Sequence, residues 1–242
     1  QTGIAGAIRI DLKRLHETWM ELLYPRQLDA EQTVLGKWRP QTTGSRIAYR
    51  LWGAIGAPIV GLLYPLVLVG YVLRYQARKL DSAVTRIGIA GVVVLSVVVW
   101  GALSVLARYQ LEMSTTGVIA VVAAGLVATV SAALAVITSR IGGRTSTVLI
   151  SYPLAITAIF LPPVVAGLYS EAVASYIFPQ SESLAEWLLE NVLTIGGLND
   201  YLWNNYELEG VAYVGMWFGI AVPVGWFLGS VVTLANYVRP RD

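Results

Sequence analysis

The stretch "LWGAIGAPIVGLLYPLVLVGYVL", residues 51–73, contains no Asp, Glu, Lys, Arg or His. As an α-helix it is long enough to cross the ~30 Å hydrocarbon core of a bilayer. Comparable apolar runs follow along the chain, at residues 87–107, 117–138, 148–169 and 211–238. Each run is predicted to be helical, because backbone groups in hydrocarbon must form their hydrogen bonds within the segment.

The composition supports the same interpretation. The 242-residue chain is 56% hydrophobic and only 13% charged, against about 25% charged residues in a typical globular protein. Its mean hydropathy is +0.62. We therefore expect an all-α, polytopic integral protein of the cell membrane, with about five transmembrane helices.

The segments outside these runs divide the rest of the chain. Residues 1–25 are predicted to form an amphipathic interfacial helix, followed by a polar connector at 26–50, the bundle at 51–238 and a tail at 239–242. The apolar positions of the first helix recur at helical spacing and share one face: Ile8, Leu12, Leu15, Trp19 and Leu22. That face could rest on the membrane surface, on a partner, or on the protein's own cytoplasmic side, and the sequence leaves these alternatives open.

Charge asymmetry predicts the orientation of the later runs. Residues 72–88, residues 139–147 and the C-terminal tail are basic, whereas residues 170–210 carry carboxylates and no Lys or Arg. Basic segments flanking membrane spans are normally retained in the cytoplasm. We therefore expect a cytoplasmic C-terminus and an acidic, helical extracytoplasmic segment at 170–210.

The first run conflicts with this scheme, because the segments on both of its sides are basic. One alternative is a proline-bent helix that crosses, with the N-terminus outside. The other is a re-entrant hairpin or interfacial element that keeps both basic flanks inside. Helix kinks are expected at prolines, including a break of the fourth run within "FLPPVV" (160–165); these are Pro58, Pro65, Pro162 and Pro163.

The residue inventory argues against catalysis. Cysteine is absent and His16 is the single histidine, which excludes thiolate chemistry and sites built from several histidines. The runs contain no ionisable side chain other than tyrosine, whereas ion-coupled carriers usually place charged groups inside the bundle. We expect no enzyme activity, no catalytic residue, no cofactor, no bound metal and no nucleic-acid partner.

Small residues four positions apart point to close helix packing. Such spacing lets helix backbones approach, either within one chain or against another subunit. The predicted helix-packing positions are Gly53, Ala57, Gly61, Ala120, Ala124, Ala128, Gly215, Gly219, Gly225 and Gly229. The leading hypothesis is a non-catalytic structural or accessory subunit of a larger membrane assembly, in contact with membrane lipid and with other subunits or copies of itself.

The acidic segment at residues 170–210 is the basis of a second hypothesis about function. "SLAEWLLENVLTIGG" (183–197) is predicted to be a helix opened by a capping box at Ser183 and Glu186 and closed by two glycines. Glu182, Glu186 and Glu190 form one acidic stripe, which could be a solvated face or a surface for cations or a partner. A channel or permease for a small neutral or cationic solute is therefore the second hypothesis. The scarcity of lysine beside arginine also suggests a GC-rich or halophilic source.

Overall fold

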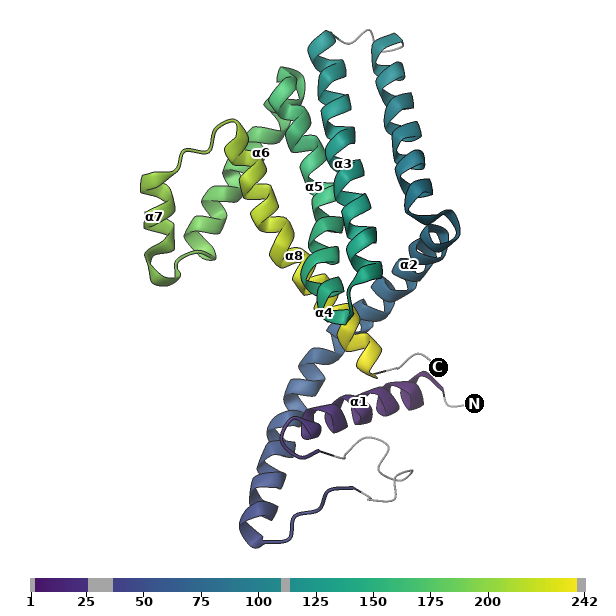
Figure 1. Ribbon diagram of the computed structural model, residues 1–242. Helices are drawn as coiled ribbons and strands as arrows, with labels where there is room; N and C mark the ends of the chain where they lie inside the picture. The colour runs from purple at the N-terminus through teal and green to yellow at the C-terminus, as the bar shows by residue number, and fades with distance from the viewer. Residues whose placement is uncertain (1–2, 26–36, 110–113, 239–242) are drawn as a thin grey trace. The chain divides into compact units, whose positions relative to one another are not determined.

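The computed structural model describes residues 3–25, 37–109 and 114–238. The described residues contain helices, turns and loops but no strand, which confirms the all-α prediction (Figure 1). A π-helical turn (Thr147–Ser151) and a 3₁₀ turn (Ile195–Gly197) accompany the α-helices. The α-helices are α1 (Ile4–Glu21), α2 (Thr43–Tyr109), α3 (Thr115–Ile141), α4 (Arg144–Ser146), α5 (Tyr152–Tyr169), α6 (Glu171–Asn191), α7 (Leu198–Asn205) and α8 (Val211–Val238).

Within the described residues, five helical segments are long and apolar enough to cross a membrane by length and composition. They coincide with the five apolar runs, so the prediction of a multi-pass membrane protein is confirmed. Their bounds are Thr43–Gln76, Gly88–Leu106, Thr115–Ile141, Arg144–Tyr169 and Val211–Val238.

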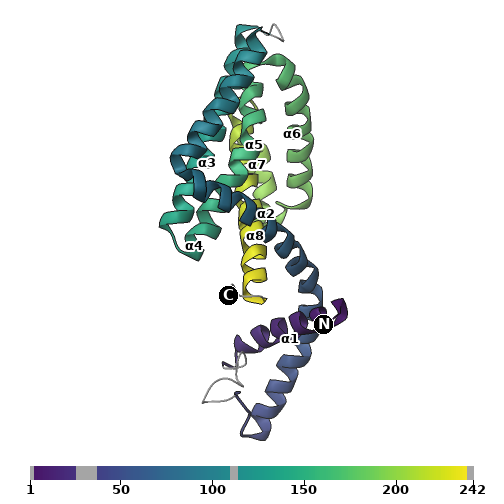
Figure 2. The same ribbon diagram turned by 90° about the vertical axis from the view of Figure 1, so that its right-hand side faces the viewer.

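The chain divides into two compact units, which are described separately. One contains residues 1–80 and 230–242, and the other contains residues 81–229. In the second unit, α3 and α5 pack against each other along their length, and α6 packs against α5 (Figure 2). The C-terminal helix α8 belongs to both units, because the division falls at Ser230.

The contact between α5 and α8 is built around a proline. Pro153 has no amide hydrogen, so it cannot donate to the carbonyl of Leu149 four residues earlier. The indole Nε1–H of Trp226 on α8 donates to that carbonyl at 3.0 Å. Gly225 lies beside it, where an added Cβ would collide with the backbone of Pro153. The missing side chain of Gly225 therefore lets α8 approach closely enough for Trp226 to satisfy the freed carbonyl.

Alanines and hydroxyls join α3 to its neighbours. Ala120 and Ala124 are buried in a cluster with Ala166 of α5, as the small-residue pattern requires for close approach. The hydroxyls of Ser96 and Thr129 lie 2.6 Å apart and link the second half of α2 to α3. Side-chain hydrogen bonds of this kind add to packing between apolar helices.

Helix α2 corrects two expectations about residues 43–109, the loop and the hairpin, while the kinks expected at Pro58 and Pro65 stay predictions. Residues 72–88 are not a loop, because the backbone stays helical from Thr43 to Tyr109 except at Gly88, where φ is 72°. The hairpin alternative for residues 51–73 is wrong for the same reason. Pro58 and Pro65 lie within helical backbone, and the interruption falls instead at Gly88, since glycine adopts positive φ without a Cβ clash.

The two remaining prolines also leave their helix intact. Helix α5 continues through Pro162 and Pro163 to Tyr169 without a break, and the kink expected at these prolines stays a prediction. A transmembrane helix tolerates proline when neighbouring groups satisfy the freed carbonyls. Both prolines lie within α5, and Pro162 is buried.

The predicted polar connector at 26–50 is partly helical, because α2 begins at Thr43. Residues 26–36 lie outside the described residues. Beyond them, Thr42 and Ser45 exchange bonds: the Ser45 amide donates to Thr42 Oγ1 at 3.2 Å, and the Thr42 amide donates to Ser45 Oγ at 3.1 Å. This reciprocal pair is a capping arrangement that starts α2 at Thr43. The "TTGS" motif therefore begins a helix rather than interrupting one.

The acidic segment is also organised differently from the prediction. Helix α6 begins at Glu171, so Ser183 is inside it and donates to the carbonyl of Pro179 at 3.0 Å instead of capping. Gly196 and Gly197 have φ of 69° and 72° and form the turn into α7 rather than the end of α6. The polar residues at 180–183 resemble a helix start locally, but α6 continues across them, with Ser181 and Glu182 bonded to Trp217 and Tyr213 of α8.

Replacing Gly225 with alanine should destabilise the bundle, because the new Cβ would press on the backbone of Pro153 and separate Trp226 from its acceptor. Overpacking and the weakened bond predict a loss of about 1–3 kcal/mol in the free energy of unfolding. The measurement is reversible unfolding in detergent micelles. Gly219→Ala is the matched control, since open space surrounds Gly219 on the same helix, and equal losses in both variants would contradict the prediction.

Candidate functional site

A reciprocal pair of tryptophans fastens α1 to α2. Trp19 Nε1 donates to the Trp52 carbonyl at 3.0 Å, and Trp52 Nε1 donates to the Trp19 carbonyl at 3.2 Å. The two rings are stacked with centroids 4.4 Å apart. Trp19 lies in the last turn of α1, and its carbonyl accepts both the Leu22 amide at 3.3 Å and the indole of Trp52, which adds a second donor at that helix end.

Two glycines of α2 make room for this pair. A Cβ at Gly56 would collide with the indole ring of Trp19, and one at Gly53 would lie 3.6 Å from Met20 Sδ. His16 Nε2 lies 3.0 Å from the carbonyl of Gly53, so Nε2 carries the hydrogen that is donated. His16 is thus part of the docking contact, although the sequence offered no role for it.

The buried face of α1 differs from the predicted one. Leu15 is buried as expected, but Ile8 and Leu22 at the two ends are exposed. The buried positions also include Met20 and Asp11, the latter with only 2% of its surface exposed. Asp11 was missed, yet it lies one helical turn before Leu15 and so falls on the apolar face. The Asp11 carboxylate therefore belongs to the buried face of α1 rather than to its solvent-exposed side.

The same face of α1 reaches the C-terminal end of α8. Arg14 Nη1 donates to the carbonyl of Val238, the last residue of that helix, at 3.4 Å. A cation at a helix C-terminus is favoured by the helix dipole. Leu15 and Val238 belong to one core cluster with Val60 and Val67 of α2. Three helices far apart in sequence therefore meet at one junction.

The crossing of α2 and α8 lies one turn further along this junction. An added Cβ at Gly70 would lie 2.5 Å from the Val231 carbonyl and 2.8 Å from Ala235 Cβ. Arg74 follows on the same face of α2 and is only 8% exposed. The run at 51–73 itself contains no charged side chain, but the longer helical segment Thr43–Gln76 also contains Arg74, which is buried.

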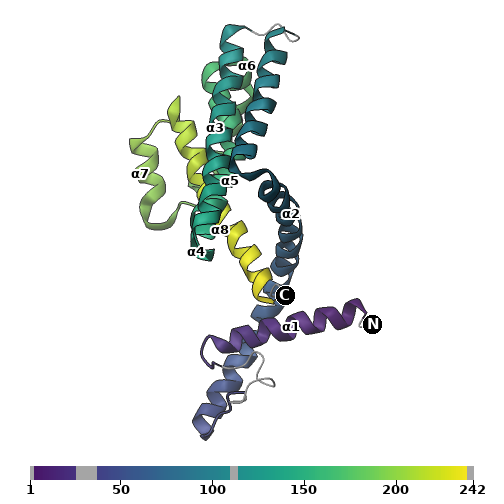
Figure 3. The same cartoon turned by 45° about the vertical axis from the view of Figure 1, so that its right-hand side comes forward.

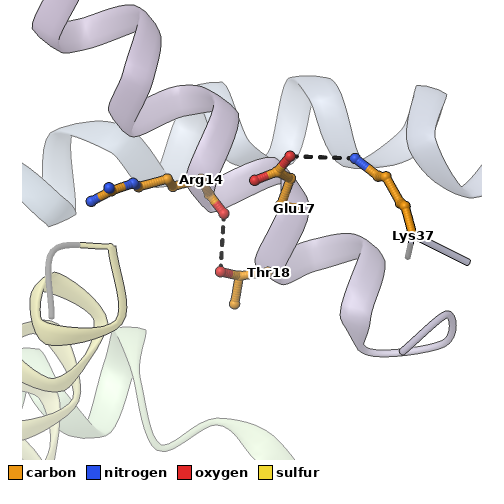
Figure 4. A network of polar contacts seen from close by, with 4 residues as sticks. All are labelled: Arg14, Glu17, Thr18 and Lys37. Atoms are coloured by element: carbon orange, nitrogen blue, oxygen red, sulfur yellow. Dashed lines mark hydrogen bonds and ion pairs between the residues drawn. The ribbon is translucent and has the colours of Figure 1, made fainter. Parts of the chain in front are cut away.

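Contacts from the connector reinforce the docking of α1. Tyr24, Trp38 and Tyr49 form a ring cluster with centroids 4.6–5.4 Å apart. Figure 4 shows Lys37 reaching Glu17 of α1, with Nζ and Oε1 3.3 Å apart. Exposed pairs of this kind contribute little stability, so the aromatic contacts are the larger attachment.

The predicted small-residue positions fall into two groups. Ala120, Ala124 and Ala128 are buried, and added Cβ atoms at Gly225 and Gly229 would meet α5 or the turn before it. Ala57 is exposed. Open space surrounds the Cβ positions of Gly61, Gly215 and Gly219. A packing role for these exposed positions stays a prediction.

The acidic stripe is only partly engaged. Glu182 accepts a hydrogen bond from the Tyr213 hydroxyl of α8, and the Tyr213 ring stacks on Phe178 with centroids 4.1 Å apart. Glu186 and Glu190 are exposed. A cation or partner role for the stripe stays a prediction.

The neighbouring contact completes the docking of α6 on α8, because Trp217 Nε1 donates to Ser181 Oγ at 2.9 Å. This contact and the Glu182–Tyr213 bond were missed from sequence, since neither pair has a local signature. Both attach α6 to the first two turns of α8.

Among the described residues, no group of three or more His, Asp or Glu side chains is placed to hold a metal ion. Comparison with protein-family models, curated proteins and solved structures gives no match. The interpretation of the junction of α1, α2 and α8 therefore rests on its geometry, and its contacts are those of helices packed against one another.

Substituting Trp19 with phenylalanine should loosen α1, because the ring stack persists while the bond to the Trp52 carbonyl is lost. The expected cost is about 1 kcal/mol, seen as faster hydrogen exchange of α1 amides. Because the two indoles contact each other, the destabilisation of the Trp19→Phe, Trp52→Phe double variant should differ from the sum of the losses in the two single variants. Trp203→Phe, at an exposed position of α7, is the control and should leave α1 exchange unchanged.

Proposed function

We propose that this chain is a non-catalytic membrane protein, a structural or accessory subunit of a larger membrane assembly. The observation that carries this proposal is on α8, which contains two pairs of glycines four residues apart. The pair Gly225 and Gly229 is closed by α5 and the π-helical turn before it, whereas the pair Gly215 and Gly219 faces open space. One pair of glycines is therefore packed against another segment of the chain, whereas the other pair meets no neighbour among the described residues.

A neighbouring transmembrane helix is the occupant that suits the open pair. Glycines at this spacing remove the side chains that keep backbones apart, so a helix gains close packing there that flexible lipid chains fill less well. Exposed aromatic side chains of the adjoining helix α7 and its following turn, Tyr201, Trp203 and Tyr206, lie near in sequence and suit the polar boundary of such a contact. The partner is a different subunit or a second copy of this chain.

Gly215→Leu combined with Gly219→Leu should separate the chain from its partners, because leucines would hold a neighbouring helix away. The measurement is native mass spectrometry after mild detergent extraction. The expected result is a change from a complex to the mass of the single chain, with the unfolding temperature of that chain unchanged. Gly101→Leu is the matched control, since open space also surrounds Gly101, on α2, and it should retain the complex.

A wild-type chain extracted without any partner would contradict the proposal, as would a double variant that keeps its partners. Solute flux through proteoliposomes containing this chain alone would favour the channel or permease hypothesis instead. Loss of that flux in Glu186→Gln and Glu190→Gln variants would assign it to the acidic stripe.

A further inference from the structure

The open glycine pair of α8 is followed one helical turn later by a proline. Gly215, Gly219 and Pro223 recur at intervals of four residues, and all three are exposed within the unit of residues 81–229. Residues at this interval share one face of a helix. Ala221 and Gly225 are buried on the opposite face, which packs toward α5; Figure 3 shows this part of α8 beside α5.

Pro223 leaves the backbone carbonyl of Gly219 without its helical donor. Proline has no amide hydrogen, so the bond from residue 223 to the carbonyl four residues earlier cannot form. The nearest indoles of α8 do not replace it, because Trp217 and Trp226 both donate to segments outside α8. Since Gly219 has no side chain to cover its own backbone, a group on the open face can reach this carbonyl.

A carbonyl at this position needs a donor from a neighbouring helix. Gly219 lies about 12 Å along the axis from the start of the apolar helix Val211–Val238. The ring of Trp217, two residues earlier, contacts Phe160 inside α5, with centroids 5.5 Å apart. An unsatisfied backbone group is costly in hydrocarbon, and lipid chains have no donor to offer. A close neighbouring helix can supply one.

The structure contains the completed form of the same arrangement. Pro153 frees the carbonyl of Leu149, the missing side chain of Gly225 lets α8 approach, and the Trp226 indole donates to that carbonyl. Proline, glycine and donor come from two helical segments in that contact. On the open face, α8 provides the proline, the glycines and the carbonyl, so the donor is the part that a partner must bring.

A second copy joined through this same face does not bring that donor. Identical patches meet in a two-fold contact, and residues 214–224 contain no side-chain donor other than Trp217, which already donates to Ser181. The glycine Cα–H groups of such a copy are much weaker donors. The chemistry therefore favours a helix of different sequence.

We propose that the partner at the open glycine pair is a helix of a different membrane protein, which donates an indole N–H or a hydroxyl O–H to the Gly219 carbonyl. This inference rests on the proposed function and identifies its partner by chemistry. The donor is a Trp, Ser or Thr within one turn of the closest approach. Phe218 and Phe227, which are 47% and 52% exposed, flank the contact and pack on the partner's side chains.

The first test identifies what covers the open face. Phe218→p-benzoylphenylalanine is photoactivated in membranes of cells that express two differently tagged copies of the chain, and the linked peptides are sequenced by mass spectrometry. The expected adduct is a helix of another membrane protein with Trp, Ser or Thr within one turn of the linked residue. The same probe at Leu126, exposed on α3, is the control and should not link to that helix.

Three kinds of adduct would overturn the proposal. One is the other tagged copy, the second is residues 43–76 of the same chain, and the third is a helix without such a donor. Adducts with lipid alone would also overturn it.

The second test removes the need for the donor. Pro223→Ala restores an amide that can bind the Gly219 carbonyl, so the dissociation constant of the complex should rise about threefold to tenfold. The measurement is native mass spectrometry over a dilution series in detergent. Pro163→Ala is the matched control, because Pro163 is an exposed proline within α5, and it should leave the dissociation constant unchanged.

A double-mutant cycle separates the hydrogen bond from a change in helix shape. Replacing the partner's donor with phenylalanine, valine or alanine should weaken the wild-type complex but add no loss in Pro223→Ala. Additive losses, or a complex that Pro223→Ala leaves unchanged, would overturn this inference and leave the proposed function standing. A chain extracted without any partner would overturn both.

Discussion

Close approach of helix backbones at glycine is the constraint on which the rest of this structure depends. Added Cβ atoms would collide at Gly56 between α1 and α2, at Gly70 between α2 and α8, and at Gly225 between α8 and α5. At Gly56 and Gly225 an indole hydrogen bond accompanies the close contact, from Trp19 to the Trp52 carbonyl and from Trp226 to the Leu149 carbonyl. Apolar helices gain no hydrophobic advantage over lipid by associating, so close packing and such hydrogen bonds hold them together.

Tryptophan fills the space beside two glycines. Trp19 occupies the space at Gly56 and Trp100 the space at Gly125, while Trp226 lies next to Gly225. A flat, rigid ring fills the volume that glycine leaves, and the indole nitrogen can donate to a carbonyl. These tryptophans therefore serve as contacts between helical segments.

The junction at the end of α8 connects local chemistry to topology. Asp11, Arg74 and the Arg14 contact with Val238 place charged groups where three helices meet. Charged groups are costly in hydrocarbon and are tolerated near an interface or beside partners. The contacts at this junction make α1 a packed part of the protein rather than a free amphipathic helix.

Sequence alone determined the class of this protein and its apolar helices. The run at 211–238 matches α8 residue for residue, because an uninterrupted apolar segment in a bilayer has no stable state other than helix. It also identified the small residues of α3, which have the periodicity of a helix face. Boundaries in polar segments were less predictable: Thr42 and Ser45 begin a helix, and Ser183 does not, since neighbouring packing decides which polar group caps.

Only the tertiary structure decided which faces meet. The Trp19–Trp52 pair, the burial of Asp11 and Arg74, and the bonds from Trp217 to Ser181 and from Tyr213 to Glu182 join residues distant in sequence. No local pattern encodes such pairs, because each bond depends on the crossing of two helices rather than on spacing along one. Residues 51–73 belong to this second class: hydropathy says that the segment can lie in lipid, and the contacts with α1 and α8 show which of its faces are covered by protein.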